Sequence, residues 1–135
     1  MRTVAAHLAS LLQARRNCVA SGNSEWLGRH SRRIELIERN HLPHGAGIDV
    51  GVKLDLAEST PFQLVLKFSY HCMNQDGYYD GWRDYTAKVK PTFDGIAVTI
   101  HGRDYNGVKD YLHDVFREAL SAEIELPVEL EGHEP

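Results

Sequence analysis

Two histidines, an aspartate and an arginine stand at the ends of short segments in which polar and apolar residues alternate. His71 ends one such segment, Asp84 begins the next, His101 ends the last one, and Arg103 follows two residues later. If these segments pair as an antiparallel sheet, alternation puts His71, Asp84 and His101 on one polar face. Imidazole and carboxylate groups bind metals and act as general acids or bases. These residues therefore allow a small metal- or ligand-binding domain or an enzyme, although an ordinary solvated sheet face is the more common explanation for them.

The segment GRDYNG, residues 102–107, follows the last alternating segment and precedes a helical one. Backbone N–H groups at a helix start attract anions, and the Arg103 guanidinium would add a fork for phosphate or carboxylate. Capping of the helix by Asn106, with Arg103 and Asp104 pairing locally, explains the same residues without a ligand.

His41 and His44, with Asp49 just beyond, have the residue types of a metal site. Pro43 and Gly45 place them in a loop rather than on one helix face, and no second ligand cluster lies nearby in the sequence. We therefore predict neither a metal nor another cofactor.

The segment YHCMNQDGYYDGWRDYT covers residues 70–86. It contains two turn-forming sequences, NQDG at 74–77 and DG at 80–81. Three tyrosines and one tryptophan follow its first residue. Tyr78, Tyr79 and Trp82 thus stand in or beside turns, where a plain hairpin carries small polar residues. Aromatic rings with polar tips dominate interaction hot spots. We predict a partner-binding surface here; the alternative is that Trp82 and one tyrosine cap the core. The neighbouring acidic residues assigned to this surface are Asp76, Asp80 and Asp84.

Three arginines on a predicted helix, Arg29, Arg32 and Arg33, lie largely off its apolar stripe and would suit contacts with nucleic-acid phosphates. The whole chain, however, has a net charge of −4, whereas a dedicated DNA-binding domain is usually basic. A nucleic-acid-binding module is therefore the weaker alternative, and direct nucleic acid binding is not expected.

Hydrophobic periodicity places these residues on three helices and four strands. Short links between the half-buried strands predict an antiparallel meander. The predicted fold is α+β: two N-terminal helices, a four-stranded antiparallel meander sheet and a C-terminal helix, with the helices packed on one face. The first helix includes Val19 in its predicted apolar stripe. The predicted helices are 4–20, 24–40 and 107–120, and the predicted strands are 48–56, 62–71, 84–90 and 96–101.

The composition is that of one globular domain. The chain has 135 residues, of which 42% are hydrophobic and 25% charged. We predict a domain over 1–120 and an acidic tail over 121–135. No segment approaches the roughly eighteen consecutive apolar residues of a membrane span, so no membrane is expected. Cys18 and Cys72 are predicted to be reduced thiols in a cytosolic protein.

Charge is distributed unevenly along the chain. Residues 1–40 contain seven arginines and three glutamates, whereas residues 41–135 contain eight basic and sixteen acidic side chains. This asymmetry indicates either a dipolar surface for a charged partner or two halves that neutralise each other in the fold.

Four motifs, SGNSEW, LPHGAGID, YYDGW and GRDYNGVKDYLHDVF, resemble those of a family of small uncharacterised proteins found on bacteriophages, plasmids and integrated mobile elements. The resemblance runs from about Ser21 to Leu120 and brings no established activity or catalytic role with it. It implies a bacterial, intracellular setting. Small accessory proteins of mobile elements often bind and inhibit host defence complexes.

The leading hypothesis is a non-enzymatic accessory protein in the cytoplasm of a bacterial host cell. It would bind a host protein or ribonucleoprotein complex, as an anti-CRISPR or anti-restriction inhibitor does. The aromatic and acidic side chains of residues 70–86 would meet a basic nucleic-acid groove on that partner. The sequence is also compatible with an oligomer.

Overall fold

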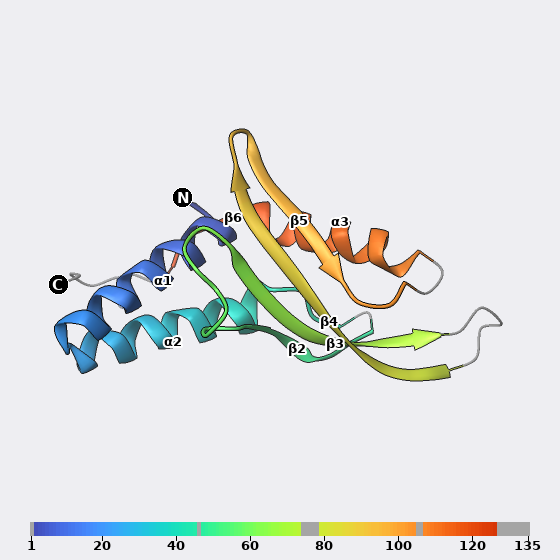
Figure 1. Cartoon of the computed structure of the whole chain (residues 1–135), viewed down its shortest axis with the longest axis horizontal. Helices are drawn as coiled ribbons and strands as arrows, with labels where there is room; N and C mark the ends of the chain where they lie inside the picture. Colours follow the sequence, from blue (N-terminus) through green and yellow to red (C-terminus); the bar gives the residue numbers. More distant parts are fainter. Residues whose placement is uncertain (1, 46, 74–78, 105–106, 127–135) are drawn as a thin grey trace.

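The computed structural model of the chain describes residues 2–45, 47–73, 79–104 and 107–126 (Figure 1). Within these ranges, three helices pack against a four-stranded antiparallel sheet, which confirms the predicted α+β fold. Two further strands of two residues each pair with one another near the ends of the described chain. The elements are β1 (Arg2–Thr3), α1 (Val4–Ser21), α2 (Ser24–Asn40), β2 (Ile48–Leu54), β3 (Leu64–Met73), β4 (Tyr79–Thr92), β5 (Gly95–His101), α3 (Val108–Ser121) and β6 (Glu123–Ile124).

The first two helices form a hairpin because a glycine ends one and an asparagine starts the next. Gly22 adopts the left-handed conformation that closes α1, and its N–H donates to carbonyl groups of the last turn. Asn23 Oδ1 accepts a hydrogen bond from the N–H of Trp26 at 3.2 Å, which caps α2. The helix break predicted at residues 21–23 is therefore confirmed.

The sheet is a meander with strand order β2-β3-β4-β5, so β2 and β5 are its edges. Leu66 at its centre pairs with Leu54 on one side and Ala87 on the other, and Ala87 pairs with Ile100. All four side chains are buried in a core that they share with all three helices. α3 runs along β5, and the α1–α2 hairpin packs toward the other end of the sheet (Figure 1).

An aromatic stack joins the middle of the sheet to α3. The ring of Phe68 stacks on Phe116 with centroids 4.9 Å apart and on Tyr85 with centroids 5.8 Å apart. The Tyr85 hydroxyl donates a hydrogen bond to the carbonyl oxygen of Arg103, just after β5. The stack therefore links two central strands to the chain segment that leads into the last helix.

Val19 is 66% exposed, so its predicted place in the apolar stripe of α1 is wrong. Cys18 takes that place and is a free thiol, 2% exposed. The reason is helical geometry: Cys18 follows the buried Leu11 and Ala14 by seven and four residues, whereas Val19 is rotated about 100° away.

β4 is longer than the alternating pattern predicts, β3 continues two residues past its predicted end, and the turn predicted at Asp80-Gly81 is wrong. Both residues lie inside β4, where Gly81 has a φ of 88°. The pairing shifts between His71 and Met73 of β3, as it does where a β-bulge adds a residue to one strand. A glycine that reads as a turn signal in the sequence is therefore the site of a strand irregularity.

The described part of the predicted tail is packed against the domain. β6 pairs with β1, and the N–H of Val4 donates to the carbonyl oxygen of Ala122 at 2.9 Å. Leu126 is 4% exposed and belongs to the hydrophobic core. The fold thus extends beyond residue 120, and the rest of the predicted tail, residues 127–135, lies outside the described ranges.

We expect Gly102→Ala to lower the free energy of unfolding by about 2–4 kcal/mol, because a Cβ at this position would overlap the ring of Tyr85 and φ is +150°. Gly95→Ala is the matched control: its φ is +154°, but nothing lies within 4 Å of an added Cβ. Urea unfolding followed by circular dichroism measures both variants. Equal losses for the two variants would show that close packing on Tyr85 is not the cause.

Candidate functional site

The face of the sheet away from the helices carries polar side chains that the strand register arranges in rows. This open face has an aromatic row at one end and lysine-containing rows at the other, and sequence alternation assigned most of these residues to it correctly. The rows are His71 with Trp82, Ser69 with Asp84, Lys67 with Thr86 and His101, and Lys88 with Thr99.

At the aromatic end, β3 and β4 continue as a two-stranded arm beyond β2 and β5 (Figure 1). We define the arm as residues 71–73 and 79–83, whose strand pairing is only with one another; at its base the His71 N–H also donates to the Gly47 carbonyl oxygen, just before β2, at 2.8 Å. β5 ends opposite Thr86, and β2 begins opposite Tyr70. The arm therefore projects from the body of the sheet without a flanking strand on either side.

Trp82 lies on the arm and is 44% exposed. Its ring contacts that of His71 on the opposite strand, with centroids 5.0 Å apart. The prediction left open whether Trp82 caps the core or faces solvent. It packs on a cross-strand neighbour and leaves close to half of its surface in water, so it presents an aromatic surface on the open face.

Asp84 lies at the base of the arm, two residues after Trp82 on the same face of β4. It is exposed, and Ser69 Oγ donates a hydrogen bond to its Oδ1 at 3.0 Å. Side chains two residues apart on a strand are separated by about 6.6 Å, so the carboxylate and the indole form one small surface. The other predicted members, Asp76, Tyr78 and the side chains of Tyr79 and Asp80, lie outside the described part of the chain.

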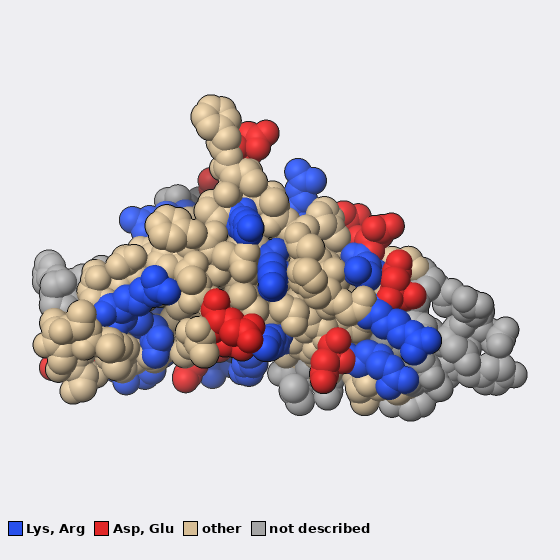
Figure 2. Space-filling view, viewed as in Figure 1, with Lys and Arg blue, Asp and Glu red and all other residues tan. Residues whose placement is uncertain are grey.

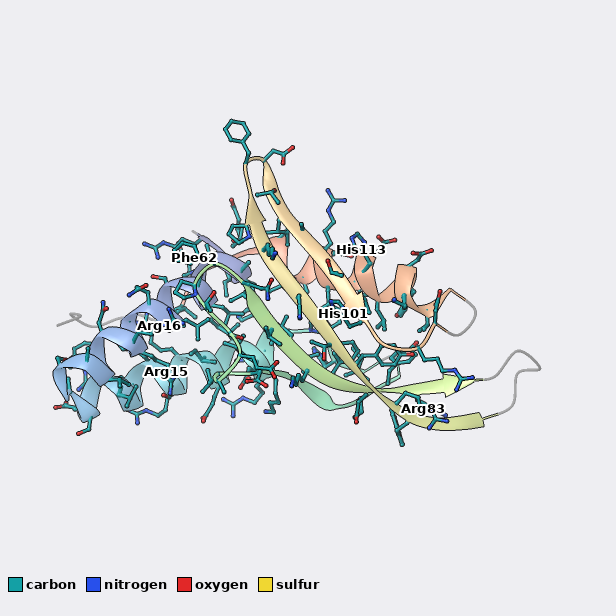
Figure 3. All side chains as sticks on the ribbon, viewed as in Figure 1. Arg15, Arg16, Phe62, Arg83, His101 and His113 are labelled. Atoms are coloured by element: carbon teal, nitrogen blue, oxygen red, sulfur yellow. The ribbon has the colours of Figure 1, made fainter. Side chains whose placement is uncertain are left out.

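His71 and His101 share the open face, as predicted, but they do not come together. His101 stands in the row of Lys67, four residues before His71 on β3 and two strands away. Standard strand spacings put the two positions about 16 Å apart. In Figure 3, His101 lies on β5 well away from Arg83 on the arm. Among the described residues, no three His, Cys, Asp or Glu side chains are grouped to hold a metal.

Arg103 and Asp104 contribute to the fold next to this face. The Arg103 carbonyl oxygen accepts the hydrogen bond from Tyr85, and Asp104 Oδ1 accepts one from the N–H of Lys109 in the first turn of α3 at 3.2 Å. Gly107 is the N-cap residue and provides no side-chain hydrogen bond. Asn106, the predicted cap, lies outside the described residues.

The loop between β2 and β3 covers the open face near Lys67. Lys67 Nζ lies 3.2 Å from Asp55 Oδ2 and 3.4 Å from Glu58 Oε2. Hydrogen bonds from the Glu58 N–H and from Lys67 lower the pKa of Asp55, and the Asp55 hydrogen bond raises the pKa of Lys67. Ser59 Oγ also bonds both backbone groups of Val65. The alternating pattern predicts only a short link here and gives no signal that the link covers part of the open face.

The three arginines of α2 do not form a continuous ridge. Arg29 pairs with Glu25 at 3.1 Å, and its guanidinium lies 4.8 Å from the ring centre of Trp26. Arg32 is exposed, but Arg33 is only 6% exposed, so its predicted place among surface phosphate contacts is wrong. Position 33 follows the buried His30 by three residues and precedes the buried Ile37 by four, which turns it toward the core side of the helix.

A polar groove of about 790 Å³ lies between α2 and the edge strand β2. His44 lines it together with Arg39 and Lys53, and Glu38 enters from α2. Glu38 Oε2 accepts a hydrogen bond from the N–H of Leu54 at 2.6 Å. Burial raises the pKa of Glu38, while this hydrogen bond opposes the rise. His41 is the C-cap of α2, and the side chain of Asp49 lies outside the described residues.

No family model matches the chain, and no curated protein or solved structure is similar enough to count as a match. The resemblance to proteins of mobile elements therefore stays a prediction. None of the helices in the described ranges is long and apolar enough to cross a membrane.

We expect Glu38→Gln to increase the free energy of unfolding at pH 7, because glutamine keeps an acceptor for Leu54 without a half-buried charge. An acid with a raised folded-state pKa contributes stability that is complete below its unfolded-state pKa and is lost as the pH rises through the folded-state pKa. The gain should therefore shrink as the pH falls through the raised folded-state pKa, and it should be lost below the unfolded-state value of 4.5. Urea unfolding from pH 3 to pH 7 measures it. Glu118→Gln, an exposed change on α3, is the control, and a matching pH profile for both variants would contradict this account.

Proposed function

We propose that this chain is a non-enzymatic binding protein that contacts a macromolecular partner through Trp82 and the surrounding open face of the arm. The observation that supports this proposal is a tryptophan, 44% exposed, on a two-stranded arm that projects beyond the rest of the sheet. A projecting arm reaches into a partner's concave surface more easily than a flat sheet does.

Trp82 stabilises the arm itself only modestly. A cross-strand aromatic pair such as that with His71 contributes about 0.2–1 kcal/mol to a sheet. The exposed remainder of the indole is available to a partner, and tryptophan is among the residue types most enriched in interaction hot spots. A surface position with this much exposed aromatic area is explained better by binding than by folding.

Asp84 defines the chemistry that the partner should offer. Its exposed carboxylate lies beside Trp82, so a complementary partner carries an apolar pocket next to a basic side chain. Basic grooves of this kind occur on proteins that hold DNA or RNA. We therefore propose a host protein or ribonucleoprotein complex as the partner, and inhibition of a bacterial defence complex as the role. The motif resemblance to mobile-element proteins supports that setting by analogy.

Affinity capture from bacterial lysate tests the proposal. We expect Trp82→Ala to reduce recovery of the specific partner at least tenfold, which corresponds to about 1.4 kcal/mol. Tyr111→Ala is the matched control, because Tyr111 is an aromatic residue on α3 that is 47% exposed. Thermal unfolding establishes that both variants are folded. Undiminished recovery with folded Trp82→Ala would refute the assignment to the arm.

The role of Asp84 is tested by binding kinetics with the captured partner. We expect Asp84→Asn to slow association and to weaken its dependence on salt, because a charge at the rim of an interface acts mainly through long-range attraction. Asp110→Asn, an exposed change on α3, should leave both quantities unchanged. Biolayer interferometry at several salt concentrations measures the rates. A faster association for Asp84→Asn would mean that the partner surface is acidic.

A further inference from the structure

The hairpin between β4 and β5 carries a fully exposed phenylalanine at its tip. Phe93 has a relative exposure of 108%, the largest among the exposed large hydrophobic residues. The hairpin stands out from the body of the molecule in Figures 1 and 2. Thr92 pairs with Gly95 across the turn, so the strands continue up to the tip and hold Phe93 away from its own core. Small polar residues are usual at such turns, so an aromatic ring at the tip is not explained by turn chemistry.

An apolar groove of about 190 Å³ lies beside the same hairpin, against α1. Ala6 and Ala9 of α1 form one wall, and Pro61, Pro91 and Ile96 contribute to the rest. The two small alanine side chains leave room that larger residues would fill. An apolar cavity of roughly 150 Å³ accommodates benzene, so this groove is large enough for a phenyl ring.

Charges at the tip and at the groove are complementary. Asp94 follows Phe93 directly and is exposed. Arg2 lies beside the groove-lining Thr3, and its Nη1 donates a hydrogen bond to Ser10 Oγ at 3.3 Å, one turn after Ala6 on α1. If Phe93 of one copy entered the groove of another, the Asp94 carboxylate of the first copy would therefore come close to the Arg2 guanidinium of the second.

We propose that the chain forms a two-fold symmetric dimer in which Phe93 of each copy enters the apolar groove of the other. A symmetric interface uses the same patch on both copies, so a tip and its groove must lie close together on one chain. Phe93 is two residues from Pro91 and from Gly95, both of which line the groove. A single two-fold axis beside the hairpin would therefore place Phe93 of each copy in the groove of the other.

The exposed apolar area is sufficient in scale for such a contact. Phe62 is 76% exposed and follows Pro61 at the groove (Figure 3). Two phenylalanine side chains bury about 300–500 Å² when covered. A stable interface buries roughly 800 Å² on each partner. The two rings thus supply close to half of it, and the hairpin, the α1 surface and the groove walls are available for the remainder.

Sedimentation velocity of the purified chain over about 1 µM to 1 mM tests the dimer. We expect the wild type to dimerise and Phe93→Ala to raise the dissociation constant at least tenfold. Ala6→Leu, which fills the groove, should have the same effect. Val19→Ala on the far part of α1 is the control, because Val19 is also exposed at 66% and lies outside this surface. A monomeric wild type, or a Phe93→Ala variant that dimerises normally, would overturn the proposal.

A charge exchange distinguishes reciprocal insertion from another interface that involves the hairpin. We expect Asp94→Arg and Arg2→Asp each to weaken the dimer, and the double variant to recover at least part of the loss. Absence of recovery would refute the proposed pairing of tip and groove. Trp82→Ala should leave dimerisation unchanged, so failure of the dimer and failure of the arm as a binding site are separate results.

Discussion

The contact of Phe68 with Tyr85 and Phe116 is the interaction on which the rest of the structure depends. It ties α3, which runs along the edge strand β5, to the two central strands, and the Tyr85 hydroxyl holds the carbonyl group of Arg103 where the chain leaves β5. Gly102 makes this possible because it has no Cβ to meet the tyrosine ring. With α3 on one side of the sheet, the polar residues of the alternating strands face outward together.

Because the helices pack on one side of the sheet, the polar side chains on the other side form the open face. The loop after β2 covers one part of it through Lys67 and Val65, and the arm extends it in the other direction. What remains open is an aromatic row followed by an acid, and then lysine-bearing rows. The face contains groups of both charges, and no three His, Cys, Asp or Glu side chains among the described residues are grouped to hold a metal.

Much of this was predictable because local patterns carry the information. Alternation assigned His71, Asp84 and His101 to one face correctly, since successive side chains on any strand point to opposite sides. The helix break at Asn23 was predictable because its side chain caps a helix through nearby N–H groups. Arg33 was assigned to the surface wrongly. A long charged side chain at the margin of an apolar stripe can point to solvent or pack against neighbouring elements, and the sequence of its own helix does not determine which of the two occurs.

The sequence by itself determined the order of helices and strands and the two faces of the sheet, because these follow from short-range sterics and hydrophobic spacing. Only the tertiary structure decided where the strands end relative to one another, and those ends create the arm. The Asp80-Gly81 pair has the same local preference in a turn and in a bulge; pairing with β3 selects the bulge. The separation of His71 from His101 was likewise set by register, a long-range property that alternation alone leaves open.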